Sequence, residues 1–510
     1  MLARVFSATS LGLETVLIDV EVDIARRSLP AFNIVGLPGK AVEEAKERVR
    51  SAVVNTGAEL PVHRITVNLS PADFPKEGPA FDLPIAVGLL IASGQISADV
   101  LESIFLGELS LDGTLRSTRG ILPATLLARE KKMKRVFVPF VNAHEATVVK
   151  NVEVFPVRSL RELFNHLTGR VLIQPVSSNK QFGRLRTNGL FDFDLTDIKG
   201  QEQAKRALEI AAAGGHNVFM VGSPGSGKTM LARAIPSILP SLSEEEAVEI
   251  TKIYSITGNL PTGEPLITNR PFRCPHHTVS RIGLIGGGSI PQPGEVSLAH
   301  RGVLFLDELS EFPRNVLESL RQPMEDGQVT VSRARGAVTF PARFSLVAAS
   351  NPCPCGYLGD RFKECSCNPG TVLRYQRRLS GPLMDRVDIH LEVPRVDIDK
   401  LEQKSGENSE SVRKRVEKAR QIQKRRYRGV GIFSNAELST RHIKTYCVLG
   451  DEASGLLRRA AEKLHLSART YFRIIKIAAT IADLADCKQI DAGHMAEAVQ
   501  YRPNHANDLG

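Results

Sequence analysis

The chain has 510 residues, of which 42% are hydrophobic and 24% are charged, and its formal net charge is +10 at pH 7. This length predicts about three domains, each with a core of its own. The longest apolar stretch, residues 83–92, is too short to span a bilayer and contains Pro84, which argues against a membrane protein. Arg4, Glu14 and Asp19 interrupt the N-terminus, so we expect no secretory signal and a cytoplasmic protein. The basic balance permits nucleic-acid binding without proving it.

The N-terminal third of the chain alternates short strands with helices. Its patterns predict helices at residues 41–55 and 83–93 and strands at residues 15–22, 65–69 and 136–139. A polar, aperiodic stretch follows and predicts a linker. We therefore predict a domain at residues 1–173 and a linker at residues 174–190.

A complete phosphate-binding loop comes after this linker. It lies between an apolar strand, residues 218–221, and a helix that begins near Lys228. Glycines let backbone N–H groups turn toward a β-phosphate, and the helix N-terminus adds the positive end of its dipole. Lys228 is placed to reach the β- and γ-phosphates, and the Thr229 hydroxyl to ligate Mg²⁺. The motif predicts that ATP and Mg²⁺ are bound by Gly222, Ser223, Pro224, Gly225, Ser226, Gly227, Lys228 and Thr229.

Residues 303–308 form an apolar run that ends in two carboxylates. A buried parallel strand presents such acids at its C-terminal edge. We predict that Asp307 holds the magnesium and that Glu308 is the general base for the attacking water; a solvated strand end is the alternative. A further apolar run, residues 344–349, leads to Asn351, whose amide is expected beside the γ-phosphate.

Residues 327–344 are predicted to form a β-hairpin, because apolar residues alternate on both sides of the turn at residues 333–336. Arg333, Arg335 and Arg343 face no acid within this hairpin. They are candidate contacts to DNA phosphates, which carry no sequence information. A solvated basic turn is the alternative.

Four of the seven cysteines are crowded into fifteen residues, in two Cys-x-Cys pairs. This pattern predicts a reduced compartment and a closed, structural Zn²⁺ site rather than disulfides. The predicted ligands are Cys353, Cys355, Cys365 and Cys367, and buried free thiols are the alternative. For His276 and His277 we expect packing or phosphate contact rather than metal binding.

The C-terminal region is predicted to be helical from residue 412 on, with leucines and alanines at helical spacing. Its basic run, residues 413–428, is opposed only by Glu417 and is equally well interpreted as a solvated helix face or as a DNA contact. We predict a nucleotide-binding core at residues 191–396 and a helical lid at residues 397–510.

The chain resembles the magnesium-chelatase-like AAA+ family and, within it, the competence-protein branch. The resemblance covers nearly the whole chain and rests on long motifs at residues 270–277, 286–289, 293–295, 298–308, 332–336 and 351–356. It implies an α/β fold with a Lon-protease-like N-terminal domain, an AAA+ P-loop core and a C-terminal helical lid. It also implies a homo-hexameric, ATP-dependent DNA helicase that acts on single-stranded or branched DNA. In this branch the activity is branch migration during homologous recombination in natural transformation.

In such hexamers the ATP site lies between subunits, so the resemblance assigns further residues to catalysis. Arg386 matches the arginine finger, which a neighbouring subunit supplies to the transferring phosphoryl group. Arg469 matches the second sensor, and Asn351 the first. The alternatives are an ion pair with Asp385 or Asp388 for Arg386, and a solvated helix face for Arg469. The hairpin at residues 327–344 matches the one that points into the central channel of related motors.

The resemblance of residues 1–173 to Lon proteases does not extend to catalysis. The serine position of the nucleophile loop falls on Ala80, and the catalytic lysine position falls near Leu122. A Ser–Lys mechanism needs an attacking oxygen and a neutral amine, and neither is present. We therefore expect a scaffold, an assembly ring or a DNA-contact surface.

The leading hypothesis is an ATP-driven hexameric DNA translocase. A chelatase-type motor that remodels a protein partner is its first rival, and an ATP-dependent protease is disfavoured by Ala80 and Leu122.

Overall fold

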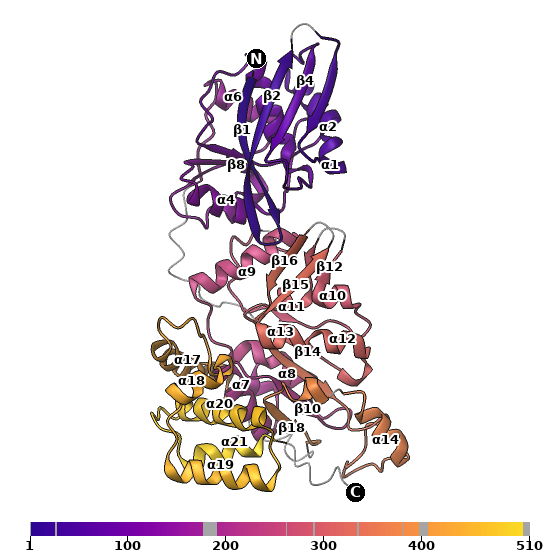
Figure 1. Ribbon diagram of the computed structural model, residues 1–510, viewed down its shortest axis with the longest axis vertical. Coiled ribbons are helices and arrows are strands. Elements are labelled where there is room, and N and C mark those ends of the chain that lie inside the picture. Colours follow the sequence, from indigo (N-terminus) through magenta and orange to yellow (C-terminus); the bar gives the residue numbers. More distant parts are fainter. Residues whose placement is uncertain are drawn as a thin grey trace. The chain divides into compact units, whose positions relative to one another are not determined.

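The computed structural model describes residues 2–25, 28–176, 191–261, 263–288, 291–333, 336–379, 381–396 and 406–502. The chain divides into two compact units (Figure 1). The first comprises residues 1–186, 244–268 and 332–339, and the second comprises residues 187–243, 269–331 and 340–510. The predicted core and lid thus fall into one unit, while a segment within the predicted core belongs to the N-terminal unit.

The first unit is built on a seven-stranded mixed sheet in the order β3-β4-β2-β1-β5-β8-β9. Alternation explains how it buries one face: Val20, Val22 and Ile24 of β2 are buried, whereas the intervening acids are not. The long strands β1 and β2 pair antiparallel, as do β2 and β4, and the remaining pairs are parallel. The strands are β1 Leu2–Leu11, β2 Glu14–Ala25, β3 Ala31–Val35, β4 Arg64–Ser70, β5 Ser103–Phe105, β8 Arg135–Pro139 and β9 Glu153–Val157.

Helices complete this unit. The helix predicted at residues 83–93 is α3, Asp82–Ala92, which is apolar on all sides and almost wholly buried. The helix predicted at residues 41–55 is interrupted at Glu44, so that two helices form, α1 Lys40–Glu43 and α2 Ala45–Thr56. The others are α4 Ile121–Glu130, α5 Ala143–Ala146, α6 Leu160–Leu167 and α9 Glu244–Thr257.

Helix α9 joins the first unit through a buried carboxylate, although it follows the phosphate-binding loop in sequence. Glu145 of α5 accepts hydrogen bonds from the Ser255 hydroxyl of α9 and, at 2.9 Å, from the backbone N–H of Leu122. Burial raises the pKa of Glu145. The Leu122 side chain, at the predicted lysine position, is fully buried.

The second unit contains a five-stranded parallel sheet in the order β11-β14-β17-β10-β18. Its central strands are apolar on both faces, as expected for a sheet covered by helices on both sides. All parallel strands end at the same edge, which collects the polar residues that follow them. The strands are β10 Val218–Val221, β11 Phe272–Arg273, β14 Val303–Leu306, β17 Ser345–Ser350 and β18 Ile389–Glu392.

The predicted lid shares a hydrophobic core with this sheet. Side chains of the lid helices, such as Leu457 and Ile474, belong to the same buried cluster as the strand residues Val218 and Val347. The lid helices are α17 Ser409–Arg426, α18 Thr440–Tyr446, α19 Asp451–Lys463, α20 Ala468–Leu484 and α21 Ala492–Gln500. The helices of the predicted core are α7 Glu202–Gly214, α8 Lys228–Ile238, α10 Arg281–Ile285, α11 Glu295–Leu298, α12 Arg314–Ser319, α13 Arg321–Asp326, α14 Pro369–Gln376 and α15 Gly381–Met384.

The predicted hairpin is present as a two-stranded sheet of β15, Gln328–Arg333, and β16, Gly336–Pro341. In the part of the chain that the structure describes, every helix is too short or too polar to cross a membrane.

Candidate nucleotide site and cysteine cluster

The phosphate-binding loop connects β10 to α8, as predicted from the sequence. Its shape depends on glycine at two positions. A Cβ atom at Gly222 would lie 2.2 Å from the carbonyl oxygen of Val393. Gly227, the residue before α8, has φ 92°, a left-handed conformation that side chains disfavour. The glycines thus allow the backbone to turn closely enough to expose its N–H groups.

Lys228, the first residue of α8, extends along this loop. Its Nζ donates to the carbonyl oxygens of Gly222 at 2.7 Å and Ser223 at 3.0 Å. It also lies 3.3 Å from Oδ1 of Asn351, the residue after β17. Burial lowers the pKa of the Lys228 ammonium, and the carboxylate of Asp307 opposes this effect. The predicted phosphate ligand and the predicted first sensor are therefore brought together at one edge of the sheet.

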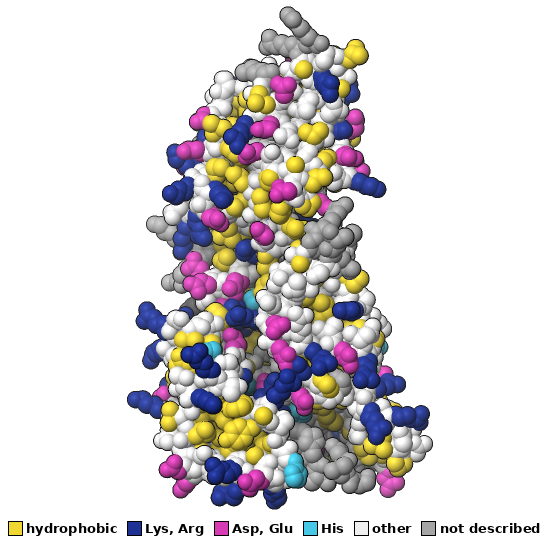
Figure 2. Space-filling model, viewed as in Figure 1, with side chains coloured by type: hydrophobic (Ala, Val, Ile, Leu, Met, Phe, Trp, Pro, Cys, Tyr) yellow, Lys and Arg dark blue, Asp and Glu magenta, His cyan; other side chains and the backbone are white. Residues whose placement is uncertain are grey.

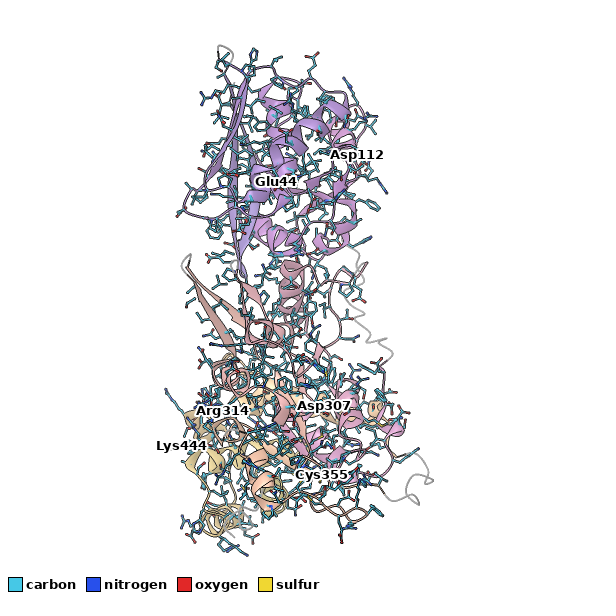
Figure 3. All side chains as sticks on the ribbon, turned by 90° about the vertical axis from the view of Figure 1, so that its right-hand side faces the viewer. Glu44, Asp112, Asp307, Arg314, Cys355 and Lys444 are labelled. Carbon is cyan, nitrogen blue, oxygen red and sulfur yellow. The ribbon has the colours of Figure 1, made fainter. Side chains whose placement is uncertain are left out.

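The predicted magnesium ligands also meet at this edge. The Thr229 hydroxyl donates to Oδ2 of Asp307 at 2.8 Å, and Asp307 follows β14, the strand next to β17 (Figure 3). A hydroxyl and a carboxylate suit the hard oxygen coordination that Mg²⁺ prefers. The donor set and its place beside the phosphate-binding loop fit a nucleotide-bound magnesium ion.

Glu308 donates its backbone N–H to Oδ1 of Asp307 at 3.0 Å. It has φ 51°, a left-handed conformation that is uncommon for a residue with a side chain. Its side chain is 58% exposed, and Oε2 lies 3.6 Å from Nδ1 of His277, which follows β11. The imidazole rings of His276 and His277 lie with their centres 4.0 Å apart and their planes tilted by 35°. We predicted packing or phosphate contact for these histidines, and the structure adds that His277 faces the predicted general base.

Arg386 and Arg469 meet at a common acid that the sequence did not single out. The Arg386 guanidinium forms an ion pair with Glu325 of α13, and the Arg469 guanidinium lies 3.7 Å from the same carboxylate oxygen. Arg386 is 5% exposed, and burial lowers the pKa of its guanidinium. The ion pair given as the alternative for Arg386 therefore exists, but its partner is Glu325 and not Asp385 or Asp388. Its role as an arginine finger remains a prediction.

A second arginine of α20, Arg473, was missed by the sequence analysis. It forms an ion pair with the buried Asp388 and donates at 2.9 Å to the backbone carbonyl of Arg386. Asp388 also accepts from the backbone N–H of Asn217 at 3.0 Å. Although burial alone would raise the pKa of Asp388, the guanidinium of Arg473 holds it well below its usual range. Arg473 thus fixes the backbone that carries the predicted finger.

The four predicted zinc ligands converge. Their sulfur atoms all lie within 4.8 Å of one another, and those of Cys353, Cys355 and Cys365 are 3.4–3.6 Å apart. Four thiolates about 2.3 Å from a central Zn²⁺ would stand about 3.8 Å apart, and the spacings among Cys353, Cys355 and Cys365 are close to this value. A hydrogen bond from the backbone of Tyr357 lowers the pKa of Cys355 to about 5, whereas the neighbouring sulfur atoms raise the pKa of Cys365 and of Cys367.

Of the three predicted DNA contacts, only Arg343 has a side chain that the structure describes. Arg335 and the side chain of Arg333 lie outside the described residues. Arg343, which follows β16, has partners within the chain: Nη1 lies 3.6 Å from Oε2 of Glu437, and the guanidinium lies 5.8 Å from the ring centre of Phe433. A phosphate would have to compete with these partners for Arg343.

Of the nine cations in the basic run at residues 413–428, five form ion pairs, and three of these pair with acids distant in sequence. Arg415 pairs with Glu209 at 2.6 Å, and Lys418 pairs with Asp486 at 2.8 Å. Three further pairs are Arg413 with Glu417, Lys414 with Glu410, and Arg426 with Asp483. On the face seen in Figure 2, basic and acidic side chains are interspersed. These pairs favour the interpretation of this run as a solvated, ion-paired helix.

The parallel sheet, the loop after β10 and the acids after β14, which β17 separates from β10, define a P-loop nucleoside-triphosphatase fold. Comparison with protein families agrees. Residues 194–401 match the family described as magnesium chelatase, subunit ChlI. Residues 20–142 match subunit ChlI of Mg-chelatase, and residues 406–502 match the C-terminal region of that subunit.

Similar proteins extend over the whole length of the chain. It is 44% identical over 507 residues to competence protein ComM of Haemophilus influenzae, covering 98% of this chain and 97% of that protein. It is also 44% identical over 504 residues to the protein YifB of Salmonella typhimurium, with the same coverage. A magnesium-chelatase 67 kDa subunit of Heliobacterium mobile is 27% identical over 259 residues, 45% of this chain and 38% of that protein.

The chain belongs to the magnesium-chelatase-like AAA+ family, in the branch that includes ComM and YifB. The predicted family is thereby confirmed, and membership in it indicates ATPase activity.

Proposed function

We propose that this protein is a homo-hexameric, ATP-dependent DNA translocase that promotes branch migration during homologous recombination in natural transformation. The observation that carries the proposal is the near full-length similarity to competence protein ComM. The β15–β16 hairpin supports it, because its turn adds two arginines directly before β17, the strand that leads to Asn351.

Each residue of the nucleotide site has a distinct task in this proposal. Lys228 and the loop N–H groups bind and neutralise the phosphates. Thr229 and Asp307 would hold Mg²⁺, which neutralises charge that develops on the phosphate oxygens. Glu308 accepts a proton from the attacking water, and its exposure leaves room for that water. The Asn351 amide, already beside Lys228, orients the γ-phosphate.

The remaining elements complete the proposed motor. Arg386 reaches the ATP of the neighbouring subunit, and Arg469 senses the nucleotide from the lid. The N-terminal unit keeps the Lon-protease-like fold as a scaffold, an assembly ring or a DNA-contact surface. With Ala80 and Leu122 at the positions of the nucleophile and the base, it has no proteolytic role.

The hairpin provides the direct test of DNA translocation. Replacing Arg333 and Arg335 together by Ala should lower DNA-stimulated ATP hydrolysis about tenfold and leave basal hydrolysis intact. The reason is that up to twelve cations per hexamer would no longer grip phosphates. ATPase rates with single-stranded, duplex and four-way DNA, and the salt dependence of DNA affinity, measure the effect. The slope of log affinity against log salt should become shallower by about two or more.

The double replacement Lys424→Ala/Arg425→Ala is the matched control, since it removes two exposed cations from α17. It should keep DNA stimulation and the salt slope. If the hairpin variant behaves like wild type and the α17 variant does not, the basic run grips DNA instead. Should wild-type hydrolysis respond to no form of DNA, the translocase proposal is wrong. Stimulation by a protein alone would then favour a chelatase-type motor, which the chelatase family matches support.

We also propose that the four cysteines hold one structural Zn²⁺. Purified protein should contain about one zinc per chain, because four closely spaced thiolates form one closed site. Replacing Cys353 and Cys365 by Ser should remove the zinc, as measured by elemental analysis. Cys487→Ser, which changes an exposed cysteine outside the cluster, should keep it. Zinc-free wild-type protein with all thiols reduced, prepared without chelators, would contradict the proposal.

A further inference from the structure

We propose that the metal-loaded cysteine loop supports the phosphate-binding loop from the side, so that zinc binding and nucleotide binding strengthen each other. The inference rests on the proposed zinc and ATP sites and concerns their coupling. The cysteine loop is defined here as residues 353–367, from the first to the last of the four cysteines.

The cysteine loop touches the phosphate-binding loop at Gly356. This glycine lies between Cys353, whose carbonyl oxygen accepts its N–H at 2.9 Å, and Pro224. A Cβ atom added to Gly356 would come within 2.6 Å of two ring carbons of Pro224. The backbone of the cysteine loop thus packs directly against the ring of Pro224, one residue beyond the ligand Cys355.

Asp360 makes a second, polar connection. The Ser223 hydroxyl donates to its carboxylate, which lowers the pKa of Asp360. The Asp360 side chain is only 2% exposed and lies 3.3 Å from Nε of Arg395. Arg395 in turn donates to the carbonyl oxygen of Pro224 at 3.2 Å. Asp360 therefore holds Ser223 directly and Pro224 through Arg395.

Both contacts are made by the segment between the two cysteine pairs. Gly356 and Asp360 lie between Cys355 and Cys365. The backbone N–H groups of Phe362 and Lys363 donate hydrogen bonds to the Asp360 carboxylate at 2.9 and 3.0 Å. A metal that binds all four thiolates fixes both ends of this segment. Without it, the four sulfur atoms are no longer linked to one another, and the segment loses the cross-link that replaces a hydrophobic core.

The consequence for the nucleotide follows from conformational entropy. Phosphate binding requires Ser223 and Pro224 in one backbone conformation, and ordering residues opposes binding. A loop that is already held by zinc loses less freedom when the nucleotide binds. Because coupling between two ligands is reciprocal, the nucleotide must tighten zinc binding by the same factor.

The test uses the full-length protein and measures two quantities: the effect of zinc on ADP affinity and the effect of ADP on zinc affinity. In excess Mg²⁺ and without free zinc, calorimetry should give an ADP dissociation constant about tenfold lower for zinc-loaded than for chelator-stripped protein. Competition with a chromophoric chelator should show zinc bound more tightly by the same factor when ADP is saturating. Equal ADP affinity of the loaded and stripped forms, both folded by circular dichroism, would overturn the inference.

Two glycine variants separate the coupling from metal binding itself. Gly356→Ala and Gly359→Ala each place a side chain at positive φ, 83° and 76°, but only the first meets Pro224; nothing lies within 4 Å of a Cβ at Gly359. Gly356→Ala should keep its zinc and weaken ADP binding, and Gly359→Ala should leave ADP binding unchanged. Equal ADP affinities in these variants would contradict the inference even if stripped wild-type protein unfolds. Absence of zinc from wild-type protein would instead refute the metal site, and absence of ADP binding would refute the proposed ATPase.

Discussion

Lys228→Ala is expected to abolish ATP binding at micromolar concentrations, whereas Glu308→Gln should bind ATP as well as the wild type does. The Lys228 ammonium lies within the phosphate-binding loop and would form charge-assisted hydrogen bonds to two phosphates. Each such bond contributes about 1.5–3 kcal/mol, so a loss of at least about 100-fold in affinity follows. Glu308 lies outside this loop, faces His277 and makes no contact that phosphate binding needs.

Glu308→Gln should lower the rate of hydrolysis by about 10²–10⁴-fold, the usual effect of removing a general base. Equilibrium binding of a fluorescent ATP analogue and single-turnover hydrolysis measure the two properties separately. The control is Glu318→Gln, which removes a carboxylate paired with Arg314 on the surface of α12 and should hydrolyse normally. Equal loss of ATP affinity in the Lys228 and Glu308 variants would overturn the division of roles.

Much of the nucleotide site could be predicted because its determinants are local. The phosphate-binding loop and the acids after β14 each occupy a few consecutive residues, and the apolar runs before them indicate buried parallel strands. Once both strands belong to one parallel sheet, their C-terminal ends lie at the same edge, separated here by β17 alone. The convergence of Thr229 with Asp307 follows from that geometry.

The charged residues that act through distant partners could not be predicted in the same way. Nothing near Arg386 in sequence indicates Glu325, which lies sixty-one positions earlier and reaches it only through the packing of α13. The acids that neutralise α17, such as Glu209 and Asp486, are equally remote. Glu417 was the only acid visible within the run, so a count of local charges overestimated how much positive charge α17 presents.

The prediction of helices and of their domains was also incomplete, because it too depended on contacts between distant residues. The pattern of residues 41–55 is helical throughout, and only the folded chain reveals the interruption at Glu44. Likewise, α9 follows the phosphate-binding loop and α8, so sequence order assigns it to the core. It lies in the first unit, where the Ser255 hydroxyl donates to the buried Glu145, a residue 110 positions earlier in the sequence.

Arg386→Ala subunits should bind ATP normally and hydrolyse it about 10³-fold more slowly, if Arg386 is the arginine finger of the neighbouring site. The ion pair with Glu325 raises a structural alternative, in which Arg386 only holds α13. Glu325→Gln separates the two roles, because it breaks the same pair and leaves the guanidinium in place. Hydrolysis should survive in Glu325→Gln and not in Arg386→Ala; parallel losses of hydrolysis and melting temperature in both would favour the structural role.

Mixing Arg386→Ala with Lys228→Ala subunits then tests whether the finger acts between subunits. Neither variant alone has an active site with both parts. In an equal, random mixture about a quarter of the interfaces would pair an intact phosphate-binding loop with an intact finger, so ATP hydrolysis should rise well above the sum of the two separate rates. The rise should peak near equal proportions and vanish when either variant is in large excess. Mixed rings whose assembly is verified by differently tagged subunits, and whose rate never exceeds that sum, would show that Arg386 does not complete a neighbour's site.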